Sequence, residues 1–457
     1  TGIQNTLIGG LAGDAMTTAS YNTAVGYDSL GANTTGANNT ALGMTSLKSN
    51  TTGGQNVALG LQTLYYNTTA SNNTALGHVA MTYNTTGTQN VAVGADALFT
   101  NTTASYNTAV GYQSLKLNTT GAQNVAVGTY ALDANTTAAN NTALGYASLG
   151  ANTTGTVNTA VGTDALRSNT TANHNTAVGY KALDVNTTGA INTALGSNAL
   201  LANTTGDNNV AVGFGALDAN TTADNNTAVG YASLGANTTG TDLVAVGRNA
   251  LVANSNGIGN TAIGDHAGYT ITTGNYNTFL GKSTTGAQAA TSGNIVVGYN
   301  SNSASTASGY CTFGYDNTRT YIALGGSSWS GTSDLRLKEN VVDHTLGLGF
   351  VNALRPVTYN WKKKKDVDTS LTDYYETDSE ERVNGTSVLR HGFIAQEVKA
   401  VMDNNDLDAE SFSLWNTMGD GTQALAPAEL IPVLTKAIQE LSTQLDAALA
   451  RITTLEG

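Results

Sequence analysis

A repeat of 17 residues runs through the first two thirds of this chain of 457 residues. The phrase Asn-Thr-Ala-Val-Gly at Asn22 returns every 17 residues, from a first copy at Asn5 to a last copy at Asn294, without insertion or deletion. Only Leu243 replaces the leading asparagine. A fixed period of this length is typical of a solenoid, in which each repeat forms one coil that stacks on the next. The repeat therefore predicts a β-solenoid over residues 1–298.

Two apolar positions of the repeat predict the core. The fourth residue is always branched aliphatic and the ninth is nearly always leucine, so stacked coils would align them into two apolar ladders. Because alternate residues of a strand point to opposite faces, we expect the branched residue to pack inside its own coil and the alanine before it to face a neighbouring chain. Each coil has room for two short strands and two turns. At about 4.8 Å per coil, the array would form a rod of about 85 Å.

Two other columns predict corners. The fifth residue is always glycine, from Gly9 to Gly298, which indicates positive φ or a close backbone approach. The twelfth to fourteenth residues are mostly Asn-Thr-Thr, as in Asn33-Thr34-Thr35, and predict a turn whose side chains bond the adjacent backbone or the same residue of the next coil. The triplet also matches a glycosylation sequon, but a repeated turn explains it better.

Composition excludes several classes of function. The net charge of −13 disfavours binding to nucleic acid, and no apolar run of about 18 residues predicts membrane insertion. Cys311 is the only cysteine, so no disulfide forms within one chain. His78, His174 and His266 occupy different repeat positions, and we predict neither a metal site nor a cofactor. The chain begins inside a repeat-like phrase, so we expect further sequence before Thr1.

Tyrosines recur at the sixth position of the repeat. In stacked coils they would form either an exposed stripe that could bind sugars or a ladder of packed rings. We favour the ladder. The tyrosines concerned are Tyr27, Tyr112, Tyr146, Tyr180 and Tyr231.

The repeats resemble the β-roll head domains of trimeric autotransporter adhesins, whose shorter repeats carry similar Asn/Ser-x-Ala-Ile/Val-Gly phrases, and phage tail-fibre repeats of the same style. The resemblance covers about residues 5–298 and implies a trimeric, mainly β shaft.

The composition changes at residue 333. No Glu or Pro precedes it, whereas the last 125 residues hold 20 of the 32 acidic residues, 12 of the 19 basic residues and all three prolines. We expect a connector of short strands over 299–332, closing the shaft, and a different domain over 333–457.

Three motifs and a heptad pattern occupy this second domain. The motifs are Ser333-Asp334-Leu335-Arg336-Leu337-Lys338-Glu339-Asn340, Leu354-Arg355-Pro356-Val357-Thr358-Tyr359-Asn360-Trp361-Lys362 and Gly392-Phe393-Ile394-Ala395-Gln396-Glu397-Val398. Apolar residues then alternate at spacings of four and three, which predicts a coiled coil at about 430–457. They are Leu434, Ile438, Leu441, Leu445, Ala448, Ile452 and Leu455.

These segments resemble the C-terminal intramolecular chaperone of phage tail spikes, endosialidases and tail fibres. The resemblance implies a small α+β domain that trimerises, helps the shaft fold in register and then cleaves itself off. Ser333 would be the nucleophile and Lys338 the base, with cleavage at about Ser333-Asp334. Arg336 and Glu339 are interpreted as surface or ion-pair residues, and Gln396 and Glu397 as structural residues, although either could orient the site.

We therefore expect a homotrimeric phage tail fibre, a virion component made in the host cytoplasm, that contacts upstream tail proteins and a host-surface glycan or protein receptor. A bacterial surface adhesin is the first alternative, although the chain ends in a coiled coil rather than in a membrane-anchoring barrel. The second alternative is the shaft of a glycan-degrading tailspike, but the shaft contains no Glu, and no pair of catalytic carboxylates is evident.

Overall fold

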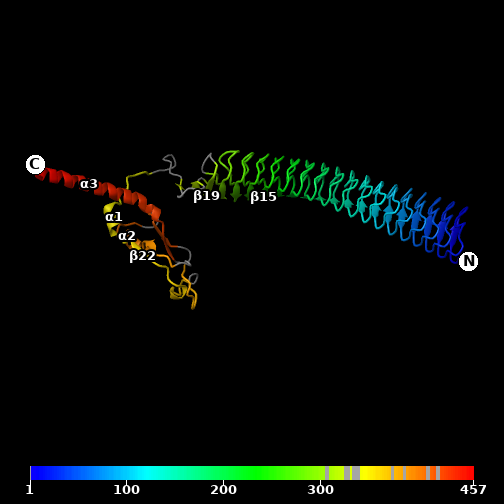
Figure 1. Cartoon of the computed structure of the whole chain (residues 1–457), viewed down its shortest axis with the longest axis horizontal. Helices are drawn as coiled ribbons and strands as arrows, with labels where there is room; N and C mark the ends of the chain where they lie inside the picture. The colour runs from blue at the N-terminus through cyan, green and yellow to red at the C-terminus, as the bar shows by residue number, and fades with distance from the viewer. Residues whose placement is uncertain are drawn as a thin grey trace. The chain divides into compact units, whose positions relative to one another are not determined.

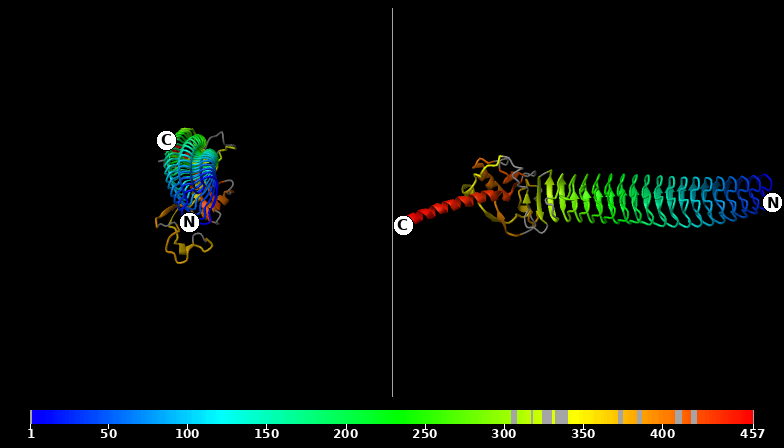
Figure 2. Two further views of the ribbon diagram at one scale, coloured as in Figure 1. Left: turned by 90° about the vertical axis from the view of Figure 1, so that its right-hand side faces the viewer. Right: turned by 90° about the horizontal axis from the view of Figure 1, so that it is seen from above.

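The computed structural model describes residues 2–303, 308–316, 318–323, 330–331, 340–371, 375–383, 387–407, 412–417 and 422–456. Ser333, Asp334 and Lys338 lie outside these ranges. The chain divides into two compact units, Thr1–Ser333 and Asp334–Gly457. The first unit contains a solenoid of 18 coils, shown as a stack in Figures 1 and 2.

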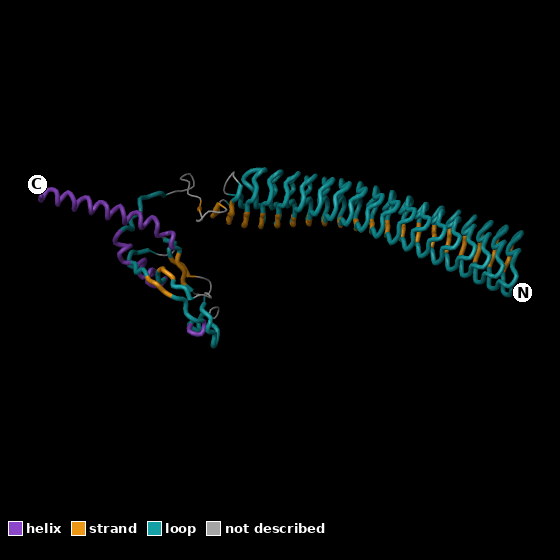
Figure 3. The backbone as a smooth tube through the Cα atoms, viewed as in Figure 1, coloured by secondary structure: helices purple, strands orange, loops and turns teal. Residues whose placement is uncertain are grey.

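Each coil contributes one strand, and consecutive strands pair in parallel so that residue i lies opposite residue i+17, as Ala109 lies opposite Ala126. The predicted second strand is absent from each described coil, because the rest of the coil consists of turns and bends (Figure 3). The strands are β1 Thr6–Ile8, β2 Thr23–Val25, β3 Thr40–Leu42, β4 Val57–Leu59, β5 Thr74–Leu76, β6 Val91–Val93, β7 Thr108–Val110, β8 Val125–Val127, β9 Thr142–Leu144, β10 Thr159–Val161, β11 Thr176–Val178, β12 Thr193–Leu195, β13 Val210–Val212, β14 Thr227–Val229, β15 Val244–Val246, β16 Thr261–Ile263, β17 Thr278–Leu280 and β18 Ile295–Tyr299.

The first unit ends in two strands of six residues and one of two. β19 Tyr310–Tyr315 continues the parallel sheet beside β18, and β20 Thr318–Ala323 and β21 Ser330–Gly331 then pair antiparallel. The change of direction ends the one-strand-per-coil pattern of the solenoid.

The core of the solenoid is narrow and contains mainly alanine and leucine. The ninth-position leucines are fully buried, as predicted, for example Leu132 and Leu166. The predicted orientation of the strand is wrong. The alanine at the third position, such as Ala143, is fully buried inside its own coil, whereas the branched residue after it points outward and Leu144 is 46% exposed. The leucine of the ninth position already fills the interior, so only a methyl group fits beside it from the strand.

Two ladders of buried asparagine hold the coils together. Nδ2 of Asn50, at the twelfth position, donates to Oδ1 of Asn33 one coil earlier at 2.9 Å and to the carbonyl oxygen of Gly53 at 2.8 Å. At the first position, Oδ1 of Asn39 accepts a hydrogen bond from the backbone N–H of Asn56 at 3.0 Å. The asparagines of the Asn-Thr-Thr sequons are those of the twelfth-position ladder, and they are fully buried. The repeated-turn interpretation of Asn-Thr-Thr is therefore confirmed.

The fifth-position glycines form the predicted corner. Their φ angles lie between +118° and +141°, a region that side-chain-bearing residues rarely adopt. A Cβ atom on any of them would also meet the carbonyl group of the corresponding glycine in the next coil.

Three of the five sixth-position tyrosines pack against neighbouring rings. Tyr112 and Tyr146 make edge-to-face contacts with Tyr130, and Tyr231 stacks on Phe214. Tyr130 lies at the seventh position, whereas Phe214 and Tyr231 both lie at the sixth, and all five tyrosines are exposed. The ladder prediction is therefore confirmed for the Tyr231–Phe214 pair alone.

The second unit is a small α+β structure that ends in a long helix. Its helices are α1 Leu348–Ala353, α2 Ala395–Asp403 and α3 Leu430–Glu456, with short 3₁₀ turns η2 Lys364–Asp366 and η3 Pro427–Glu429. Two antiparallel strand pairs complete it. They are β22 Val357–Tyr359 with β23 Arg390–Gly392, and β24 Trp415–Thr417 with β25 Gln423–Leu425.

Candidate assembly and self-cleavage site

The first motif of the second domain, with the predicted nucleophile Ser333 and base Lys338, lies outside the described residues, as do Asp334, Arg336 and Glu339. The roles predicted for these residues therefore remain predictions. The two other motifs and the heptad helix are described.

The second and third motifs lie side by side. β22 from the second motif pairs with β23, which leads into the third, so that Val357 lies opposite Gly392. Nε of Arg355 donates to Oε2 of Glu397 at 2.9 Å, and a second bond joins the same two side chains. This bidentate pair lowers the pKa of Glu397, mainly through the hydrogen bond. Glu397 therefore bridges the two motifs.

An apolar core packs the start of α3 against α1 and α2. Phe350 of α1, Val398 and Met402 of α2, and Leu430 and Val433 of α3 are all buried. Phe350 also meets Phe412 edge to face, with ring centroids 6.0 Å apart. The first turns of α3 are therefore part of the folded domain, which supports a helix that would be marginal alone.

A polar contact extends the docking of α3. The backbone N–H of Leu348, in the first turn of α1, donates to Oε2 of Glu440 at 2.9 Å. An N–H at the start of a helix has no partner within that helix, so the carboxylate caps α1 and lies near its positive end.

The heptad residues lie beyond this docked face and are exposed. The exposed fractions are 43% for Leu434, 67% for Ile438, 54% for Leu441, 59% for Leu445, 49% for Ile452 and 85% for Leu455. We call these six residues the α3 seam. With the exposed Ala448 between Leu445 and Ile452, these residues recur at alternating spacings of four and three, the pattern of the surface that coiled coils bury.

A lysine cluster in the second unit is neutralised by acidic residues. Lys363 and Lys365 both contact Glu380, and Lys364 contacts Glu376 and Glu381. The two lysines beside Glu380 lower its pKa to about 2 through hydrogen bonds. Its contribution to stability is present above the ordinary carboxyl pKa and is lost as the pH falls towards 2. The three lysines over 363–365 therefore form no free cationic patch.

Within the described ranges, no set of three or more His, Cys, Asp or Glu side chains is arranged to hold a metal ion. Over the same residues, no helix combines the length and apolar character needed to cross a membrane.

Comparison with known proteins places residues 333–407 in one family. They match the family model described as chaperone of endosialidase, a family of self-cleaving intramolecular chaperones. No curated protein and no solved structure matched the chain. The matched residues begin where the composition changes and include all three motifs. Residues 333–407 are therefore similar to the chaperone family of endosialidase, and they follow a β-solenoid of 17-residue repeats.

Proposed function

We propose that this chain is one third of a homotrimeric phage tail fibre, whose C-terminal unit aligns three shafts and then cleaves itself off at about Ser333-Asp334. A fibre-like solenoid followed by an endosialidase-type chaperone fits a phage tail fibre or tailspike with an intramolecular chaperone. The observation that carries the proposal is the match to this chaperone family, which begins directly after the shaft.

Two apolar surfaces support trimer formation. The first is the α3 seam, in which Ile438, Leu445 and Ile452 hold one heptad position and Leu434, Leu441 and Leu455 hold the other. These exposed apolar side chains would be buried against neighbouring copies in a coiled coil. The second is the outer face of the solenoid strands, where the fourth-position residues form a continuous column. Leu76, Leu144 and Leu195 are 45%, 46% and 48% exposed along it. We propose that this column, rather than the alanines, faces the neighbouring copies.

The uniform repeat explains why a chaperone is needed. Three shafts can pair one coil out of step at almost no local cost, because every coil presents nearly the same residues. A C-terminal unit that trimerises first would hold the three ends together at high effective concentration and set a single register. Cleavage would then remove the C-terminal unit from the assembled shaft. Without this unit the chains could not be realigned after separating, so the assembled shaft would be kinetically trapped.

The proposed cleavage uses Ser333 as nucleophile and Lys338 as base. A serine hydroxyl is a weak nucleophile until a base takes its proton, and a lysine can do so when burial or neighbouring charge lowers its pKa. The hydroxyl oxygen would attack the carbonyl carbon of the scissile peptide bond and form an ester as the C–N bond breaks. The leaving amine would take up the proton that Lys338 had accepted, and water would then hydrolyse the ester to a carboxylate and the free serine hydroxyl. Each chain cuts itself once.

Denaturing gel electrophoresis of purified wild type tests the cleavage. We expect fragments of about 333 and 124 residues from the 457-residue chain, and a single full-length band from Ser333→Ala and from Lys338→Ala. A full-length band for wild type, identical to that of Ser333→Ala, would refute self-cleavage. The family model names no host, and we propose that the shaft or its upstream partners contact a host-surface glycan or protein.

A further inference from the structure

Aromatic side chains gather on the shaft in three consecutive repeats. Tyr65, Tyr66, Tyr83 and Phe99 occupy the tenth and eleventh positions there, whereas the eleventh position of all other repeats holds Ala, Ser, Thr, Leu or Val. These four residues are not among the tyrosines singled out from the sequence, which lie at the sixth position. Aromatic residues at the tenth and eleventh positions of neighbouring repeats depart from the repeat consensus, and this departure could have indicated the group.

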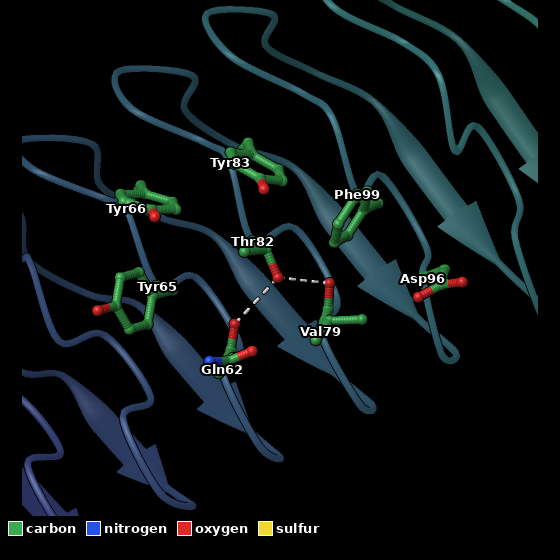
Figure 4. Close-up of a pocket in the computed structure, with 8 residues that line it drawn as sticks. All are labelled: Gln62, Tyr65, Tyr66, Val79, Thr82, Tyr83, Asp96 and Phe99. Atoms are coloured by element: carbon green, nitrogen blue, oxygen red, sulfur yellow. Dashed lines mark hydrogen bonds between the residues drawn. The ribbon is translucent and has the colours of Figure 1, made fainter.

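Two of these rings border a recess at the tenth position. Tyr65 and Phe99 hold that position two coils apart, and Thr82 holds it in the coil between them. The shorter threonine leaves a recess of about 340 Å³, which Tyr66 and Tyr83 also line (Figure 4). Tenth positions of alternate coils are about 9.6 Å apart, which leaves room for one six-membered ring. We call this recess the Tyr65–Phe99 slot.

The slot is held in shape by contacts around it. Tyr66 stacks on Tyr83 with centroids 5.3 Å apart, and the outer rings meet this pair edge to face, Tyr65 at 4.6 Å and Phe99 at 5.0 Å. Thr82 is only 6% exposed, and its hydroxyl lies 2.8 Å from the carbonyl oxygen of Val79. Rings that are already packed lose little conformational entropy when a ligand binds.

Charges beside the slot are paired within the chain. Lys48, which lies over the Tyr65 ring, pairs with Asp28 at 3.0 Å. Asp96, at the lip, pairs with Lys116 at 3.6 Å and accepts a hydrogen bond from Gln113 at 3.0 Å. An anionic ligand would find no unpaired cation here, and a cationic ligand would find no unpaired carboxylate. The slot therefore favours a neutral ligand.

Polar groups at the lip complement the aromatic walls. The exposed side-chain amide of Gln62 makes no hydrogen bond within the described part of the chain, and the hydroxyl groups of Tyr66 and Tyr83 are likewise unbonded there. A pyranose ring offers C–H groups to apolar walls and hydroxyls to such donors and acceptors within one small unit. Aromatic lining with a few polar groups is typical of small-ligand sites.

We propose that the Tyr65–Phe99 slot binds one pyranose unit of a neutral glycan, which gives the host contact of the proposed function a place and a ligand class. The slot is built from turn residues of a single chain and includes no residue of β4, β5 or β6. It can therefore be tested whether or not the shaft trimerises.

An array of immobilised oligosaccharides probed with the full chain tests the slot. The array carries neutral glycans of glucose, galactose, mannose and N-acetylglucosamine beside sialylated and sulfated ones. We expect binding to at least one neutral glycan, with a Kd that calorimetry can measure. Tyr65→Ala/Phe99→Ala removes the walls and Thr82→Phe fills the slot, and each is expected to weaken binding at least tenfold. The control Tyr112→Ala/Tyr146→Ala removes exposed tyrosines elsewhere and is expected to bind as wild type does.

The proposal is overturned if wild type binds no neutral glycan, if it binds only anionic glycans, or if Thr82→Phe binds as tightly as wild type. Capture of a host protein that persists after enzymatic removal of its glycans and in Thr82→Phe would also contradict it. Light scattering on the same samples separates the two proposals, because a trimer that binds no glycan refutes the slot alone, and a monomer that binds refutes trimerisation alone.

Discussion

Replacing Gly145 by alanine is expected to disrupt the shaft at one coil. The φ angle of Gly145 is +136°, and a Cβ atom would lie 2.5 Å from the carbonyl oxygen of Gly162 and 2.6 Å from its carbonyl carbon. Both the backbone strain and the clash oppose the substitution, and the Gly162 backbone is held in place because its N–H donates to the carbonyl oxygen of Leu144 at 2.7 Å. We expect a loss of about 4 kcal/mol or more in the free energy of unfolding.

Chemical unfolding followed by circular dichroism measures this loss, and limited proteolysis locates it. Gly150→Ala is the matched control, since Gly150 lies in the same coil and a Cβ atom there would come no closer than 3.2 Å to its nearest neighbour, the carbonyl oxygen of Ala147. Other repeats carry Lys, Asp or Arg at this position. We expect the control to change stability by less than about 1 kcal/mol. Equal unfolding midpoints for the two variants would contradict the corner assigned to the glycine column.

Leu441→Asp is expected to prevent assembly of the fibre and leave monomers. Leu441 is 54% exposed in the single chain, so the aspartate can be accommodated in the folded C-terminal unit. In a three-stranded seam, three carboxylates would instead lie close together without water or a cation, which costs about 3 kcal/mol or more per chain. Multi-angle light scattering reports the mass of the assembly directly.

An alanine on the opposite face of α3 provides the control for this variant. Ala450 is exposed and lies five residues after Leu445, away from the α3 seam, so Ala450→Asp places the same charge on the same helix. We expect this control to stay trimeric. Monomers from both variants, or trimers from both, would argue against the α3 seam as the trimer contact.

Much of the shaft was predictable because its constraints repeat. The glycine column indicated a corner and the ninth-position leucines indicated the core, since each recurs in nearly every coil. The orientation of the strand was not predictable by the same reasoning. Successive residues of a strand point to opposite faces, so Ala143 and Leu144 must lie on different sides of the strand, but this rule does not say which side is buried. The larger Leu144 lies outside because Leu149 fills the interior of the coil.

The number of strands per coil depended on backbone conformations that the residue types do not reveal. Asp164 and Leu166, at the seventh and ninth positions, and Asn140, at the seventeenth, have φ angles of +57°, +51° and +61°. Left-handed residues bend the chain into turns, where we predicted a second strand. Glycine would have indicated these positions, but the ninth-position leucine does not.

In the C-terminal unit, sequence identified the motifs but not their contacts. The order of the three motifs indicated the family, and the heptad spacing indicated an exposed seam on α3. The bridge between Arg355 and Glu397 could not be predicted, because it joins residues 42 positions apart whose proximity depends on the pairing of β22 with β23.

Comparing the full chain with residues 1–333 alone, by light scattering and electron microscopy, tests the central claim that the C-terminal unit sets the register. We predict uniform trimeric shafts from the full chain, and from residues 1–333 either monomers or mixed assemblies whose chains are offset by whole coils. Soluble, uniform trimers in register from residues 1–333 alone would contradict it.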